Sequence, residues 1–172
     1  MSELAEMTRA SAANLEITLE EATTFIWREA ELLDRQDYKP WLDLWTEDGL
    51  YVIPIERGDG ELADTLNVAY DDAGMRAARV RRLKSGFSIS SAPSARTVRL
   101  VSRFVTQTDE NGEMLIVRAA QQIVEYKFER TRLLGADMTY HLVRKGSELK
   151  LAHKEVRLLN SDDPLWGIGY LL

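Results

Sequence analysis

The sequence lacks cysteine altogether and contains only two histidines, His141 and His153, among its 172 residues. The absence of cysteine excludes a disulfide framework, thiolate catalysis and a thiolate metal site. No apolar run approaches the length needed to span a bilayer. The N-terminal residues 1–17 lack the basic start and the apolar core of a signal peptide. We therefore expect a cytoplasmic protein in which residues 1–17 form a mobile tail.

Basic residues are also fewer than acidic residues. The chain has 22 Lys and Arg residues against 28 Asp and Glu residues, which gives a formal net charge of −6. Binding to nucleic acid without regard to base sequence relies on Lys and Arg that neutralise phosphates. We therefore expect neither nucleic acid nor a membrane as partner. The expected partners are proteins or small molecules.

An amphipathic helix is predicted to begin at Thr18. Thr18 and Glu21 have the spacing of a capping box, in which each side chain accepts a hydrogen bond from a free backbone N–H of the other residue. Apolar residues then recur every three or four positions, so one face of the helix should dock on the rest of the protein. These residues are Leu19, Ala22, Phe25, Ile26, Leu32 and Leu33.

A second, short helix is predicted from Pro40, because proline fixes φ and lacks the N–H that would be unpaired in a first helical turn. This helix should carry Trp41 and Trp45. Gly49 should end it before a strand over residues 50–55.

The remainder of the chain is predicted to be mainly strands. A polar connection over residues 56–75, with a short strand near 66–70, leads to a basic helix over 76–84. Strands are expected over 95–107, 114–130, 136–144 and 148–160, joined by turns at 109–112, 134–135 and 145–147. Helices followed by long antiparallel strands indicate an α+β fold, with the helices on one face of one curved antiparallel sheet. Residues 18–172 should form this single domain.

Three separated blocks of the sequence resemble the small (beta) subunits of aromatic-ring-hydroxylating dioxygenases, in the order found in that family. The blocks are residues 25–54, residues 82–86 with 91–97, and residues 154–162 with 168–172. Phe87, Ser88 and Ile89 depart from the usual family pattern, which leaves the subfamily open. The resemblance covers roughly residues 19–172 and implies the cone-shaped NTF2-like fold, also called SnoaL-like or cystatin-like.

The resemblance also implies that the chemistry takes place in another chain. In this family the large (alpha) subunit carries a Rieske 2Fe-2S centre and a mononuclear non-haem iron. A Rieske centre needs two Cys and two His, and the oxygenase iron needs two His and a carboxylate. With no Cys and two His, this chain should hold no cofactor. Its implied role is a non-catalytic trimeric base for three alpha subunits, which receive electrons from a reductase or ferredoxin and dihydroxylate an aromatic compound.

A different class of function is an independent NTF2-like isomerase, dehydratase or hydrolase with a pocket inside the cone. Its acid–base group would be His141 with Asp43 or Asp48, and Tyr51 or Tyr126 would donate a hydrogen bond. Candidate pocket-lining residues are Trp41, Trp45, Tyr51 and His141. Aromatic residues at this spacing are more often core, and His153 shares a strand face with Glu155 and Arg157. A homo-oligomeric binding module is a third possibility, which no motif supports.

Candidate subunit contacts are Arg79, Arg81, Arg82, Arg96, Trp166 and Tyr170. The arginines of the basic helix suit forked pairing with carboxylates of a partner. Their alternative is a solvated helix face that the preceding acidic loop neutralises. The two aromatic residues near the end of the sequence suggest a docked terminus between subunits.

Overall fold

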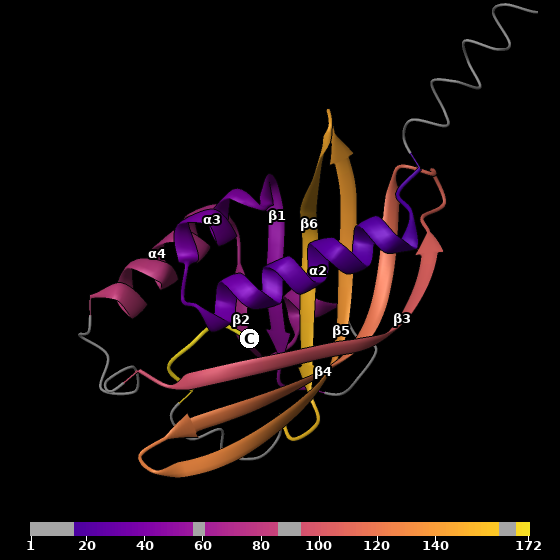
Figure 1. The fold of residues 1–172 in the computed structure, drawn as a ribbon. Coiled ribbons are helices and arrows are strands. Elements are labelled where there is room, and N and C mark those ends of the chain that lie inside the picture. The colour runs from indigo at the N-terminus through magenta and orange to yellow at the C-terminus, as the bar shows by residue number, and fades with distance from the viewer. Residues whose placement is uncertain (1–15, 57–60, 86–93, 162–167) are drawn as a thin grey trace, which may run out of the picture.

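The computed structural model describes residues 16–56, 61–85, 94–161 and 168–172. In this part of the chain, helix α2 crosses one face of a curved sheet of six strands, and α3 and α4 lie beside it (Figure 1). The strand order is β2-β1-β6-β5-β4-β3. The elements are α2 (Leu19–Asp34), α3 (Tyr38–Asp43), β1 (Trp45–Pro54), a 3-10 turn (Leu62–Asp64), β2 (Asn67–Asp71), α4 (Ala73–Lys84), β3 (Arg96–Thr108), β4 (Met114–Lys127), β5 (Arg130–Lys145) and β6 (Glu148–Leu158).

Helix α2 begins as predicted. The backbone N–H of Glu21 donates to the Thr18 hydroxyl at 3.2 Å, and the Thr18 N–H donates to the Glu21 carboxylate at 2.9 Å, which completes the capping box. The predicted apolar face is wrong for Leu19, whose side chain is half-exposed. The prediction is confirmed for Ala22, Ile26 and Leu33, which form the buried stripe together with Glu29 and Ala30. A glutamate therefore occupies a core position of this helix.

The second helix is shorter than predicted. It starts at Tyr38 and ends at Asp43, and Trp45 is already the first residue of strand β1. Gly49 lies inside β1 instead of ending the helix. A Cβ atom at Gly49 would lie 2.9 Å from the Trp45 ring and 3.0 Å from the Leu151 carbonyl oxygen. The glycine is required by this close approach, where the pairing of β1 with β6 shifts register.

The hairpin between β4 and β5 corrects two further predictions. Strand β4 ends at Lys127, and the turn is formed by Phe128 and Glu129, both with positive φ (51° and 59°). Gly135 lies within β5 opposite Gln122 and does not form a turn. The reason for this glycine is packing, since a Cβ atom there would lie 2.9 Å from Leu159 Cδ1. The other two predicted turns are confirmed, with positive φ at Gly112 and Gly146.

The sheet is not wholly antiparallel. Four of the five neighbouring strand pairs are antiparallel, whereas β1 runs parallel to its neighbour β6. The connection from β1 to β6 therefore spans the rest of the domain, and elements far apart in the sequence meet inside the cone. Within the described residues, no helix combines the length and the apolar character needed to cross a membrane.

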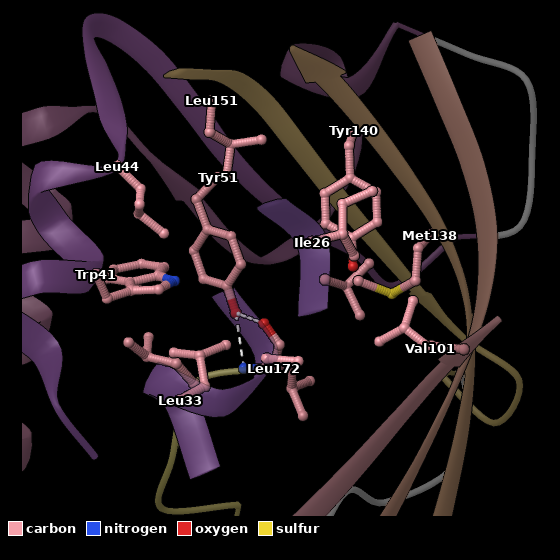
Figure 2. Packing of buried hydrophobic residues seen from close by; sticks show 14 of the residues in the cluster. Ile26, Leu33, Trp41, Leu44, Tyr51, Val101, Met138, Tyr140, Leu151 and Leu172 are labelled. Atoms are coloured by element: carbon pink, nitrogen blue, oxygen red, sulfur yellow. Dashed lines mark hydrogen bonds between the residues drawn. The ribbon is translucent and has the colours of Figure 1, made fainter. Parts of the chain in front are cut away.

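The core lies between α2 and the inner face of the sheet. Figure 2 shows Ile26 and Leu33 of α2 facing residues of β1, β5 and β6, among them Tyr51, Tyr140 and Leu151. Residues 168–172 enter the same core, because Leu171 and Leu172 are each only 2% exposed. Figure 1 accordingly marks the C end near the middle of the molecule.

Candidate functional site

A buried ion pair lies in the interior of the cone. Glu29 of α2 and Lys154 of β6 are both fully buried, and Lys154 Nζ donates to Glu29 Oε1 at 2.6 Å. The indole N–H of Trp41 donates to the same oxygen at 2.7 Å. Charges taken out of water require such partners, because their desolvation is otherwise uncompensated. The second carboxylate oxygen, Glu29 Oε2, has no hydrogen-bond partner among the described residues.

The main chain of Leu172 completes this cluster. Lys154 Nζ donates to the Leu172 oxygen at 2.8 Å. The Tyr51 hydroxyl donates to the same oxygen at 3.0 Å and accepts a hydrogen bond from the Leu172 N–H at 2.9 Å, as the dashed lines in Figure 2 show. One residue earlier, Arg99 of β3 donates to the Leu171 oxygen and also pairs with Asp34 of α2. Residues 171 and 172 are thus hydrogen-bonded to side chains of β1, β3 and β6.

Burial shifts the pKa of Lys154 and of two buried tyrosines, Tyr51 and Tyr140. Burial lowers the pKa of Lys154, and the adjacent Glu29 carboxylate opposes that shift. Burial also raises the pKa of the Tyr51 and Tyr140 hydroxyls well above their ordinary value. Both phenols are therefore neutral at physiological pH and act as hydrogen-bonding groups. The Tyr140 hydroxyl has no partner within the part of the chain that the structure describes.

The structure brings together three of the four candidate pocket residues. Trp41, Trp45 and Tyr51 pack edge to face in the core, with ring centroids 5.4 to 6.1 Å apart. His141 alternates with the buried Tyr140 and Leu142 along β5, so it projects from the opposite, outer face of the sheet. There it lies opposite His153, with ring centroids 4.8 Å apart. His141 and the three aromatic residues therefore do not form one site.

The acid–base group considered for an independent enzyme is not assembled. Asp43 and Asp48 are exposed, and Tyr126 is 40% exposed on β4. Burial lowers the pKa of His141, and the neighbouring His153 lowers it further. Among the described residues, no three His, Asp or Glu side chains are grouped so that they could hold a metal ion.

One face of the basic helix α4 points inward, with Arg76 and Val80 buried. Arg76 is buried, lies over the Trp45 ring at 4.2 Å, and donates to the carbonyl oxygens of Gly49 and Asp71. Arg79 donates two hydrogen bonds, of 2.5 and 2.9 Å, to the Asp71 carboxylate. Neither a partner surface nor bulk solvent is needed to explain these two residues. Only the outer part of the helix remains available to a partner.

The remaining candidate contact residues differ in exposure. Arg81, Arg82 and Arg96 are exposed, and the Arg96 guanidinium lies 4.8 Å from the centre of the Tyr126 ring. Tyr170 is buried, with the Arg99 guanidinium 5.7 Å from its ring. Trp166, like residues 87–89, lies outside the described residues. The contacts of the three exposed arginines with a partner stay a prediction.

An apolar patch, which was not predicted from the sequence, covers one end of the outer sheet face. Val98, Val124 and Leu133 form one cross-strand row over β3, β4 and β5. Exposed apolar side chains lie on and around this row: Val98, Leu100, Tyr126, Leu133 and Leu159, each at least 40% exposed. Contiguous apolar surface of this kind marks interaction sites. The available signal was the pair of apolar residues Val98 and Leu100, which alternate with the inward-facing Arg99 and Val101 along β3.

Comparisons with known proteins give a consistent result. Residues 28–162 match the family model described as ring hydroxylating beta subunit. The small oxygenase component of the p-cumate 2,3-dioxygenase system of Pseudomonas putida is 30% identical over 141 residues, which are 80% of this chain and 77% of that protein.

Solved structures agree at the level of the fold. The beta subunit of a benzoate 1,2-dioxygenase from Burkholderia mallei has a TM-score of 0.74 at 23% identity, covering 91% of this chain and 99% of that one. An NTF2-like protein with a cystatin-like fold from Novosphingobium aromaticivorans has a TM-score of 0.57 at 16% identity, covering 93% and 90%. The predicted NTF2-like architecture is therefore confirmed.

Proposed function

Because the chain belongs to the ring-hydroxylating beta subunit family, we propose that it is the non-catalytic small subunit of an assembly that dihydroxylates an aromatic compound. The match over residues 28–162 carries this proposal. The interior of the cone supports it, because large aromatic side chains and the Glu29–Lys154 pair fill the described core. The relative from P. putida belongs to a system that acts on p-cumate, and for this chain we propose only the broader class of aromatic rings.

The redox centres belong to the larger partner in this proposal. The residues of this chain do not fit a Rieske 2Fe-2S centre, since that centre needs two Cys and two His and the sequence has no Cys. Its two histidines would also have to serve the mononuclear iron, which takes two His and a carboxylate. A reductase or ferredoxin would deliver electrons to the partner and not to this chain.

We further propose a trimer of this chain that supports three alpha subunits in the cytoplasm. The row of Val98, Val124 and Leu133, in which Val98 and Leu133 are exposed, supports this assembly, because contiguous apolar surface is normally covered in a stable complex. The exposed Arg81, Arg82 and Arg96 are proposed contacts for carboxylates of a neighbouring subunit. Residues 18–172 form the domain that assembles in this way.

The non-catalytic role predicts a small effect when both histidines are replaced. In the assembled enzyme, His141→Gln together with His153→Gln should leave the rate of ring dihydroxylation within about threefold of the unmodified enzyme, because neither imidazole transfers a proton or binds iron. Product formation by the purified complex would be measured, with size-exclusion chromatography to confirm an intact assembly. A loss of about 1000-fold in an intact complex, the size expected for a lost acid–base group, would place chemistry in this chain.

A further inference from the structure

We propose that Lys154, Tyr51 and Arg99 form a binding site for a short apolar peptide, and that residues 168–172 of this chain occupy the site as a tethered ligand. The site would recognise two successive main-chain oxygens and the side chains that accompany them. This inference is independent of the proposed function, since it concerns only contacts within one chain.

The polar contacts are those of a peptide-recognition site. The neutral Tyr51 hydroxyl and the Lys154 ammonium both donate to the Leu172 oxygen. The Tyr51 hydroxyl also accepts a hydrogen bond from the Leu172 N–H. Arg99 donates to the preceding main-chain oxygen, that of Leu171. Main-chain recognition of this kind fixes the direction and register of a bound peptide, whereas side-chain pockets select its sequence.

The apolar contacts supply the selection. Leu171 and Leu172 are each 2% exposed and Tyr170 is 8% exposed, so three successive side chains are anchored in the core. Figure 2 shows Leu172 below the Tyr51 ring and beside Leu33 of α2. A glycine, Gly169, precedes these anchors. The segment thus buries three apolar side chains, while its main-chain oxygens accept hydrogen bonds from Tyr51, Arg99 and Lys154.

Lys154 and Arg99 each have a partner outside this segment, and the cluster also contains polar atoms that are unpaired within the described part of the chain. Lys154 is held by Glu29, and Arg99 is held by Asp34, so both cations have a carboxylate partner on α2 before they meet the peptide. Two fully buried polar atoms, Glu29 Oε2 and the Tyr140 hydroxyl, remain unpaired among the residues described. Buried polar groups without partners are uncommon in cores that pack only for stability. The segment leaves these two atoms unpaired, so the proposal rests on the hydrogen bonds that Lys154, Tyr51 and Arg99 make to it.

The test separates the segment from the chain after folding. In the full-length protein, a protease-recognition sequence with flexible linkers is inserted between residues 161 and 168, and the folded protein is then cut. We expect the released peptide to stay bound through size-exclusion chromatography. A fluorescein-labelled peptide with the sequence of residues 168–172 should replace it, with a dissociation constant measurable by fluorescence anisotropy.

Two variants examine the donors. Tyr51→Phe keeps the ring and removes only the hydroxyl, and Lys154→Met removes the cation; each should raise the dissociation constant at least about tenfold, as for the loss of a buried hydrogen bond. Lys150→Met is the matched control on the same strand, since Lys150 is partly exposed and donates to the Asp43 oxygen. It should leave the dissociation constant within about twofold.

The other possible results of the cutting experiment either support or contradict the peptide site. If cutting unfolds the protein and the added peptide restores its circular dichroism spectrum, the site is supported. If the peptide leaves the cut protein and the remainder stays folded without taking up labelled peptide, the proposal is wrong. It is also wrong if the protein unfolds and the peptide does not restore it, or if Tyr51→Phe binds the peptide as tightly as the control.

Discussion

Replacing Lys154 with methionine is expected to lower the free energy of unfolding by about 3–5 kcal/mol, because the change leaves a buried carboxylate without its cation. Glu29 is fully buried and its Oε1 receives the 2.6 Å hydrogen bond from Lys154. Guanidinium denaturation at pH 7, followed by circular dichroism, would measure the loss. Lys150→Met removes a partly exposed lysine of the same strand and should change stability by no more than about 0.5 kcal/mol.

A double variant separates the energy of the Glu29–Lys154 ion pair from the effect of losing either residue alone. Glu29→Met combined with Lys154→Met replaces the ion pair by apolar side chains of similar length, so its loss should be smaller than that of Lys154→Met alone. Trp41 would lose an acceptor in this variant, and Tyr51 would still donate to the Leu172 oxygen. A double variant that loses as much as the sum of both single variants would show that the two charges are not coupled.

The second large effect is expected at Trp41. Trp41→Ala should lower the free energy of unfolding by about 3–5 kcal/mol, as for other buried large-to-small substitutions. The ring is fully buried, packs edge to face on Trp45 and Tyr51, and donates to Glu29. The same denaturation experiment would measure this loss.

Trp27→Ala is the matched control for that substitution. Trp27 is 56% exposed, although its indole N–H donates to the Val101 oxygen. Its removal should lower stability by about 1 kcal/mol, the usual contribution of one hydrogen bond. Equal losses for the two tryptophans would contradict the position of the core between α2 and the sheet.

The parts of the fold that follow from local chemistry could be predicted from the sequence. The capping box of Thr18 and Glu21 placed the start of α2, and the glycines of the Gly112 and Gly146 turns placed two hairpins. The β4–β5 turn could not be placed, because Phe128 and Glu129 adopt positive φ without the residues that favour it. Gly135 was misleading, since it makes room for Leu159 and does not form a turn.

The buried cluster was missed although the sequence contains a signal for it. Lys154 shares the inner side of β6 with Val156 and Leu158, and Arg99 shares the inner side of β3 with Val101. A charged residue at an inward position of an apolar strand face requires a buried partner. Glu29, three residues after Ile26 and four before Leu33 in the helical stripe, meets that need. Their pairing depends on the tertiary fold and could not be derived from spacing along the chain.

The apolar patch on the outer sheet face depends on the pairing of three separate strands. The apolar row of Val98, Val124 and Leu133 arises only when β3, β4 and β5 lie in this register. Apolar residues at outward positions of a strand, such as Val98 and Leu100, indicate burial, but they do not tell a core from a surface covered by a partner. The family resemblance supplied the expectation of a partner, and the structure locates apolar surface available to one.

The role as the small subunit of a ring-hydroxylating enzyme is tested most directly by purifying the tagged chain gently from its own host, grown on an aromatic carbon source. The visible spectrum and the masses of the purified chains would be recorded. We expect a brown complex with Rieske-type absorption that contains this chain and a larger chain in equal numbers. A colourless homo-oligomer without a larger chain would contradict this role and favour an independent NTF2-like protein.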